Sequence, residues 1–209
     1  MPDFALFSPL SQQTTSIWLP MALFAFASSV TPGPNNIMLA SSGLNHGFRR
    51  SVPHMLGISG GFMLMLVVVG LGLGMLFQAW PALYDWLKIA SAAYLLYLAW
   101  RIASAGPVTG EGQTSRPLSF MQAALFQWVN PKAWTMALGV VAVYMPQTDF
   151  LANLLIGALL CGLVNLPSIS IWTLFGVALR RCLRQPGAVR AFNIGMALLL
   201  LASLYPMLR

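Results

Sequence analysis

The sequence predicts an all-α integral membrane protein with six transmembrane helices, arranged as two inverted-topology three-helix halves. Of its 209 residues, 58% are hydrophobic and only 7% are charged, against about 25% charged in a typical soluble domain. Six apolar segments are long enough to cross the bilayer, which takes about 20 residues each. Two of these segments, the first and the fourth, are interrupted by proline next to asparagine.

The predicted spans follow one another with short connections. They cover residues 17–44, 53–77, 83–103, 118–145, 150–179 and 191–208. The longest polar connection, 104–117, is too short to hold a folded domain. We therefore expect one membrane domain over 1–209, with a first half at 17–103 and a second half at 118–208. No soluble catalytic or nucleic-acid-binding module fits into such a chain.

The basic residues predict the orientation. They gather in the connections after the first, third and fifth spans, as Arg49, Arg50, Arg101, Arg116, Arg180, Arg181, Arg184 and Arg190. The connections after the second and fourth spans contain no Lys or Arg. The positive-inside rule places the arginine-bearing connections in the cytoplasm. Both termini are then predicted to lie outside, and the net charge of +7 reflects orientation more than an anionic partner.

The interruptions in spans 1 and 4 are the main functional signal. Proline removes a backbone donor and disfavours helix geometry in the preceding residue. In lipid, the freed backbone groups need partners in protein or a water-lined cavity. Because the two spans enter from opposite sides, the halves have opposite topology, and paired broken helices of this kind indicate a secondary transporter's binding site. The alternative is a pair of proline kinks that only aid packing.

Candidate substrate-binding residues lie at the two breaks and on two other spans. They are Pro32, Gly33, Pro34, Asn35, Asn36, Asn130, Pro131, Lys132, Asn165 and His54. A carboxylate can be met by N–H groups at the start of the half-helix after Pro34 and by the charge of Lys132. An ammonium can be met by freed carbonyls and by the asparagine amides. Lys132 could instead snorkel to an interface, although its position midway along span 4 argues against that.

Span 2 carries glycines and a histidine whose roles are predicted separately. Gly57 and Gly61, like Gly70 and Gly74, have the spacing that lets neighbouring helices approach closely. His54 lies near the predicted cytoplasmic end, where an interfacial histidine is favoured over a proton relay.

Enzymatic and metal-binding functions are not expected. Residues 57–61 contain a G-x-S-x-G pattern, but His54 lies about 140° around the helix from Ser59. No other span supplies a base for that serine, so a hydrolase is excluded on geometry. Two cysteines and two histidines are scattered along the chain, which does not match metal-ligand spacing, and no cofactor is predicted.

Three segments together resemble the LysE/RhtB (lysine exporter / homoserine-threonine resistance) family of bacterial amino-acid exporters. They are residues 31–57, which begin with the Thr-Pro-Gly-Pro-Asn-Asn motif, residues 87–101 and residues 130–132. The motif followed by His-Gly-Phe-Arg is most similar to the cysteine and O-acetylserine exporter branch. The sequence departs from the usual family pattern at Ser51 and Ser91, where glycine is common.

The resemblance implies a multi-pass protein of the bacterial cytoplasmic (inner) membrane that exports amino acids or close derivatives without ATP, driven by protons. The sequence thus predicts a secondary-active exporter of small zwitterionic amino acids working by alternating access. Its expected partners are the substrate, lipid and protons, and a homo-oligomer remains an open alternative. Two other functions also stay open, namely a cation or metal efflux protein and a membrane scaffold that transports nothing.

Overall fold

The computed structural model describes residues 10–73, 75, 79–80, 82–105, 116–183 and 185–205, and its regular structure in these ranges is helical. The elements are α1 (Leu10–Val30), α2 (Pro34–His46), α3 (Phe48–Val68), η1 (Val69–Leu73), α5 (Ala82–Ala103), α6 (Phe120–Gln127), α7 (Pro131–Tyr144), α8 (Phe150–Cys182) and α9 (Pro186–Ala202). The predicted all-α class is therefore confirmed.

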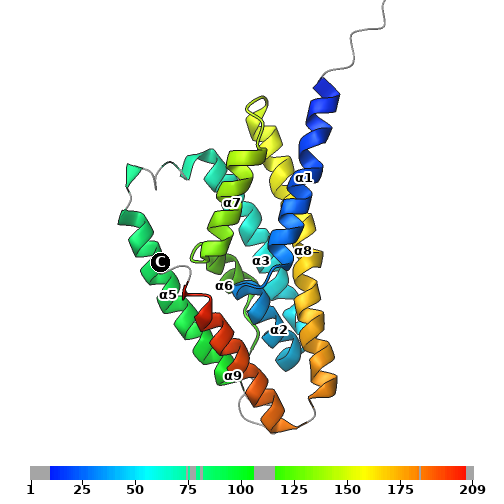
Figure 1. Cartoon of the computed structure of the whole chain (residues 1–209), viewed down its shortest axis with the longest axis vertical. Helices are drawn as coiled ribbons and strands as arrows, with labels where there is room; N and C mark the ends of the chain where they lie inside the picture. Colours follow the sequence, from blue (N-terminus) through cyan, green and yellow to red (C-terminus); the bar gives the residue numbers. More distant parts are fainter. Residues whose placement is uncertain are drawn as a thin grey trace, which may run out of the picture.

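The helices form a bundle, in which α5 and α9 are tilted relative to α1, α7 and α8 (Figure 1). α1 and α2 follow each other end to end, and so do α6 and α7. α8 packs along both α1 and α2, α3 packs against α6 and α8, and α5 pairs with α9 at one edge.

Two helical stretches are long and apolar enough to cross a membrane, judged by length and composition: Phe48–Leu73 and Phe150–Arg180. Ile17–Val30 and Pro186–Ala202 are shorter apolar helices. Large apolar side chains also face outward, among them Leu159, which is 51% exposed, and Leu163, which is 63% exposed. In lipid such side chains need no protein cover, so the exposed surface suits a membrane environment.

Both predicted breaks are present. The first break, residues 31–33, separates α1 from α2, and the second break, residues 128–130, separates α6 from α7. Pro34 and Pro131 each occupy the first helical position after a break, where a missing N–H costs no helical hydrogen bond. Asn130 caps α7, since its side-chain oxygen accepts a hydrogen bond from the backbone N–H of Lys132 at 3.2 Å.

Some predicted boundaries were wrong. α3 begins at Phe48 and not at Pro53, because Gly47 adopts φ 80° and lets α3 start directly after α2. Ser51 therefore lies inside α3, where its hydroxyl donates to the Gly47 carbonyl at 2.9 Å. α9 begins at Pro186, five residues before the predicted residue 191.

Glycines set the spacing of the helices around the breaks. A Cβ on Gly57 would meet the Phe120 carbonyl, and a Cβ on Gly61 would lie 2.8 Å from the Ala124 carbonyl oxygen. The predicted packing role of this pair is therefore confirmed, with α6 as the partner helix, whereas Gly74 lies outside the described residues. Gly43 of α2 lies in the same way against the backbone of α8.

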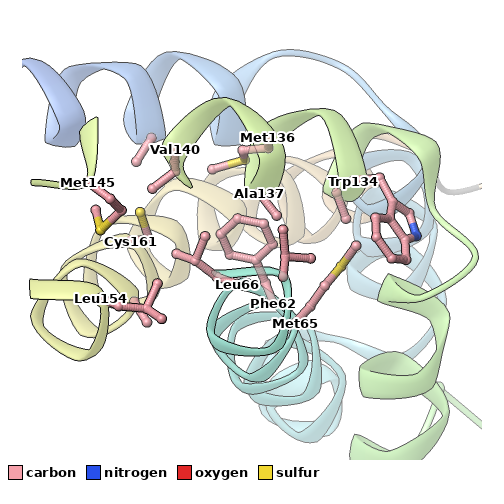
Figure 2. Packing of buried hydrophobic residues seen from close by; sticks show 14 of the residues in the cluster. Phe62, Met65, Leu66, Trp134, Met136, Ala137, Val140, Met145, Leu154 and Cys161 are labelled. Carbon is pink, nitrogen blue, oxygen red and sulfur yellow. The ribbon is translucent and has the colours of Figure 1, made fainter. Parts of the chain in front are cut away.

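An apolar cluster fills the bundle beside the second break. Figure 2 shows Phe62 and Leu66 of α3 beneath Ala137 of α7, with Leu154 and Cys161 of α8 alongside. These side chains are almost fully buried. The cluster fixes α7 against α3 and α8, and thereby holds the residues that begin α7 in place.

Candidate functional site

The two breaks meet through Lys132. Its ammonium group donates a hydrogen bond to the Thr31 carbonyl and lies 3.5 Å from the Pro32 carbonyl oxygen. Gly33 makes room for this approach, because a Cβ at that position would lie 2.9 Å from Cδ of Lys132. Gly33 itself has an extended backbone, with φ −174°, so the glycine is needed for space and not for backbone freedom. Among the described residues, no carboxylate forms an ion pair with Lys132.

A second link joins the breaks through side-chain amides. Asn35 donates from Nδ2 to Oε1 of Gln127 at 2.9 Å, and Gln127 returns a bond from Nε2 to Oδ1 of Asn35 at 3.3 Å. Gln127 also donates to the Ala123 carbonyl and is 1% exposed. Gln127 was not predicted, although a glutamine three residues before Asn130 in an apolar span was a usable signal.

Asn36 forms hydrogen bonds with the backbone on the α1 side of the first break. Its Nδ2 donates to the carbonyls of Ser29 and Thr31, each at 2.8 Å. These bonds satisfy backbone acceptors that the interruption of α1 sets free. The side-chain oxygen of Asn36 accepts no bond from another described residue, and Asn36 lines a cavity. That oxygen is therefore an available acceptor.

Asn165 of α8 links the end of α1, next to the first break, to α3. Its Nδ2 donates to the Ser29 hydroxyl at 2.9 Å, and its oxygen accepts from the Ser59 hydroxyl at 2.8 Å. The indole N–H of Trp172 donates to the Val30 carbonyl at 3.0 Å. The serine of the G-x-S-x-G pattern thus serves as a hydrogen-bond partner of Asn165. Ser29, Ser59 and Trp172 were not predicted, because such bonds depend on how the helices pack.

These groups surround a small polar cavity, which we call the central cavity. Its polar lining comes from the helix ends on either side of the two breaks, from the second break itself and from α8, with Ser28, Ser29, Asn35, Asn36, Gln127, Asn130, Lys132 and Asn165. Its volume is about 30 Å³. A second, larger cavity of about 310 Å³ also borders Lys132 and is lined by Pro32, Pro34, Pro131, Thr135 and Ser203. Gly33 and Lys132 line both.

Nine of the ten predicted site residues thus lie together, and His54 does not. His54 is buried in α3 and lines a different cavity, together with His46 and Arg101. Its side chain is only 1% exposed, and its expected depth near the membrane interface stays a prediction. In the part of the chain that the structure describes, no group of three His, Cys, Asp or Glu is placed to hold a metal ion.

The arrangement combines one cation, amide oxygens and backbone carbonyls at the junction of two interrupted helices. Such junctions are where membrane transporters bind substrates and ions, because irregular backbone at membrane depth is tolerated when it lines a cavity. The fold and the site therefore have the features of a helical membrane transporter.

Comparison with known proteins identifies the family. Residues 26–203 match the model of the LysE type translocator family, so the chain belongs to this family and is a translocator, not an enzyme. It is 34% identical over 180 residues to the cysteine/O-acetylserine efflux protein of Escherichia coli O139:H28 (strain E24377A / ETEC), covering 85% of this chain and 90% of that protein.

The proteins of the same name from Escherichia coli (strain K12) and Shigella flexneri serotype 5b (strain 8401) are 34% identical over 179 residues, with the same coverage. The predicted resemblance, including its branch, is thereby confirmed. No solved structure matches the chain.

Proposed function

We propose that the chain is a secondary-active exporter of small zwitterionic amino acids from the cytoplasm, in the class of cysteine and O-acetylserine. The observation that carries the proposal is Lys132 of the second break, whose ammonium rests on the backbone carbonyls of the first break. The relatives named as cysteine/O-acetylserine efflux proteins support the substrate class.

The bonding of Lys132 explains why a zwitterion suits this site. A substrate carboxylate that takes over the Lys132 ammonium releases the carbonyls of Thr31 and Pro32. Those carbonyls, with the unused Asn36 oxygen, can then accept bonds from the substrate ammonium. A simple anion would leave the Pro32 carbonyl without the Lys132 ammonium and the Thr31 carbonyl with only its bond from Asn36. A simple cation would face the charge of Lys132. Buried polar groups left without partners are costly, so the exchange favours a ligand with both charges.

The proposal includes an architecture and a cycle. One domain has a first half at 17–103 and a second half at 118–208, six spans of inverted topology, and both termini outside the bacterial cytoplasmic membrane. The central cavity and the second cavity share Gly33 and Lys132 in their linings, and we infer that the substrate passes between them as the site opens alternately to the two sides of the membrane. The proton gradient as driving force rests on the family resemblance.

The two other functions are weaker. A cation or metal efflux protein would place a fixed cation, Lys132, in its own pathway, and repulsion at close range opposes this. A scaffold gives no reason for a lysine and several amides to surround a polar cavity inside a membrane, where such groups are costly.

The proposal is tested by export from intact cells. Cells that express the chain should hold less cysteine, O-acetylserine or another small neutral amino acid than cells with an empty vector, and should better tolerate a toxic analogue. A matched variant, Lys132→Met, should abolish the difference at equal membrane expression. If a broad amino-acid screen shows no efflux while a divalent metal ion is exported, the protein is a metal exporter and this proposal is wrong.

A further inference from the structure

A separate polar cavity lies at the far end of α2 from the breaks. It is enclosed by α2, α3, α5 and residues 116–118, and its volume is about 60 Å³. We call it the arginine-side cavity, because Arg101 and Arg116 line it. It shares no lining residue with the central cavity. Along α2 the lining residues of the two cavities that are nearest in sequence, Asn36 and Met38, are two positions apart, and those farthest apart, Asn35 and His46, are separated by about 17 Å at a rise of about 1.5 Å per residue.

Several polar side chains in the wall of this cavity bond to neighbouring residues of the bundle. Ser42 and Ser51 hydroxyls share a hydrogen bond of 2.7 Å. Asn45 and Asn193 exchange two bonds, at 2.9 and 3.1 Å, and Asn193 also donates to the Ala105 carbonyl at 2.6 Å. These bonds fix α2 against the α5–α9 pair. The wall is therefore built independently of any ligand.

His54 is the exception among these groups. Its side chain is 1% exposed and lines the cavity, and neither Nδ1 nor Nε2 has a hydrogen-bond partner among the residues that the structure describes. Buried polar atoms nearly always have a partner. A neutral imidazole offers one donor and one acceptor. An imidazole held at a polar cavity with both nitrogens unused points to a ligand that can supply bonds to them.

The charge around the cavity points to an anionic group. Arg101 donates from Nη2 to the Arg116 carbonyl at 2.9 Å, which anchors the guanidinium and leaves other N–H groups for a ligand. No acidic side chain lines the cavity among the described residues. The pKa of His46, which also lines the cavity, lies below its usual value. Burial is the largest cause, and the positive charges of Arg50, Arg101 and Arg180 add to it. The charges of these arginines favour a bound anion.

We propose that the arginine-side cavity is a second binding site for the substrate's carboxylate, in which Arg101 supplies the charge and His54 donates a hydrogen bond. The proposal rests on the proposed function and adds a loading step to it. If the arginine-bearing side faces the cytoplasm, as the positive-inside rule predicts, the substrate binds here before it reaches the central cavity along α2.

The test separates the two sites with purified protein. Lys132→Met disables the central site, so any remaining stabilisation by acetate, a carboxylate without an ammonium, reports on the arginine-side cavity. We expect Lys132→Met to keep this stabilisation. Adding Arg101→Gln should weaken acetate binding on the order of tenfold, the loss of one charge-assisted bond. Adding Arg190→Gln instead, at an exposed arginine outside the cavity, should change nothing.

His54→Phe provides an independent check, because it fills the same space and removes both ring nitrogens. If it folds, it should also lose acetate binding; if it does not fold, the Arg101→Gln comparison decides the question. Equal stabilisation by sulfate would overturn the assignment to a carboxylate, and acetate binding unaffected by Arg101→Gln would overturn the site.

Failure of this proposal is distinguishable from failure of the proposed function. Wild-type export with no acetate binding in Lys132→Met rejects only the second site. Arg101-dependent acetate binding without any amino-acid export supports the second site and rejects the exporter.

Discussion

Replacing Lys132 with methionine isolates the charge at the junction of the two breaks. Methionine keeps most of the apolar stem and deletes the ammonium that contacts the Thr31 and Pro32 carbonyls. A hydrogen bond to a charged group contributes about 1.5–3 kcal/mol. An ammonium at mid-membrane costs about 2.5–3.5 kcal/mol on insertion scales. Because these terms nearly cancel, the ligand-free variant should unfold within about 4 °C of the wild type.

The substrate-bound state should respond differently. Losing the charge-assisted bond to the carboxylate costs about 1.5–3 kcal/mol, which corresponds to about 10- to 150-fold in the dissociation constant. Thermal unfolding with and without cysteine or O-acetylserine measures both effects on one preparation. Lys88→Met is the control, since Lys88 is exposed and lies outside the site. Wild-type substrate stabilisation and transport by a well-expressed Lys132→Met protein would refute the carboxylate role.

Three further changes test the site, the packing and the topology. Gln127→Leu should lower the free energy of unfolding by about 1–3 kcal/mol, because Asn35 loses its hydrogen-bond partner. Adding Asn35→Leu should restore stability but not transport, and unchanged transport in either variant would show that this amide pair has no role in transport. Gly57→Ala should lower the unfolding temperature by overpacking α3 on α6, whereas Gly195→Ala, with open space, should not; equal effects would contradict the packing account. A reporter fused after Gly112 should read cytoplasmic, and an outward reading would contradict the inverted arrangement.

The local signals in the sequence predicted the breaks well. Proline beside asparagine determines backbone geometry within a few residues, so both breaks lie where they were expected. Lys132 was expected to meet the same carboxylate as the half-helix after Pro34, and its ammonium indeed lies against the first break. The start of α3 was wrong because Gly47 allowed a sharp turn between helices without an intervening loop, and composition alone does not show that.

Contacts between helices were not predictable. Gln127 and Trp172 bond to groups 92 and 142 residues away, and those partners depend on how α6 and α8 pack on the first break. The predicted role of the asparagines also changed, because Asn36 and Asn165 use their N–H groups to satisfy the protein itself. His54 was grouped with the breaks on chemistry alone, whereas its position in α3 places it in another cavity.

Efflux from proteoliposomes tests the central claim most directly. Vesicles with purified wild-type protein are loaded with a panel of labelled amino acids, and release is followed with and without an imposed proton gradient. The account predicts release of at least one small neutral amino acid, accelerated by the gradient and absent with Lys132→Met. Release of no amino acid from vesicles in which the protein is folded and inserted would contradict it.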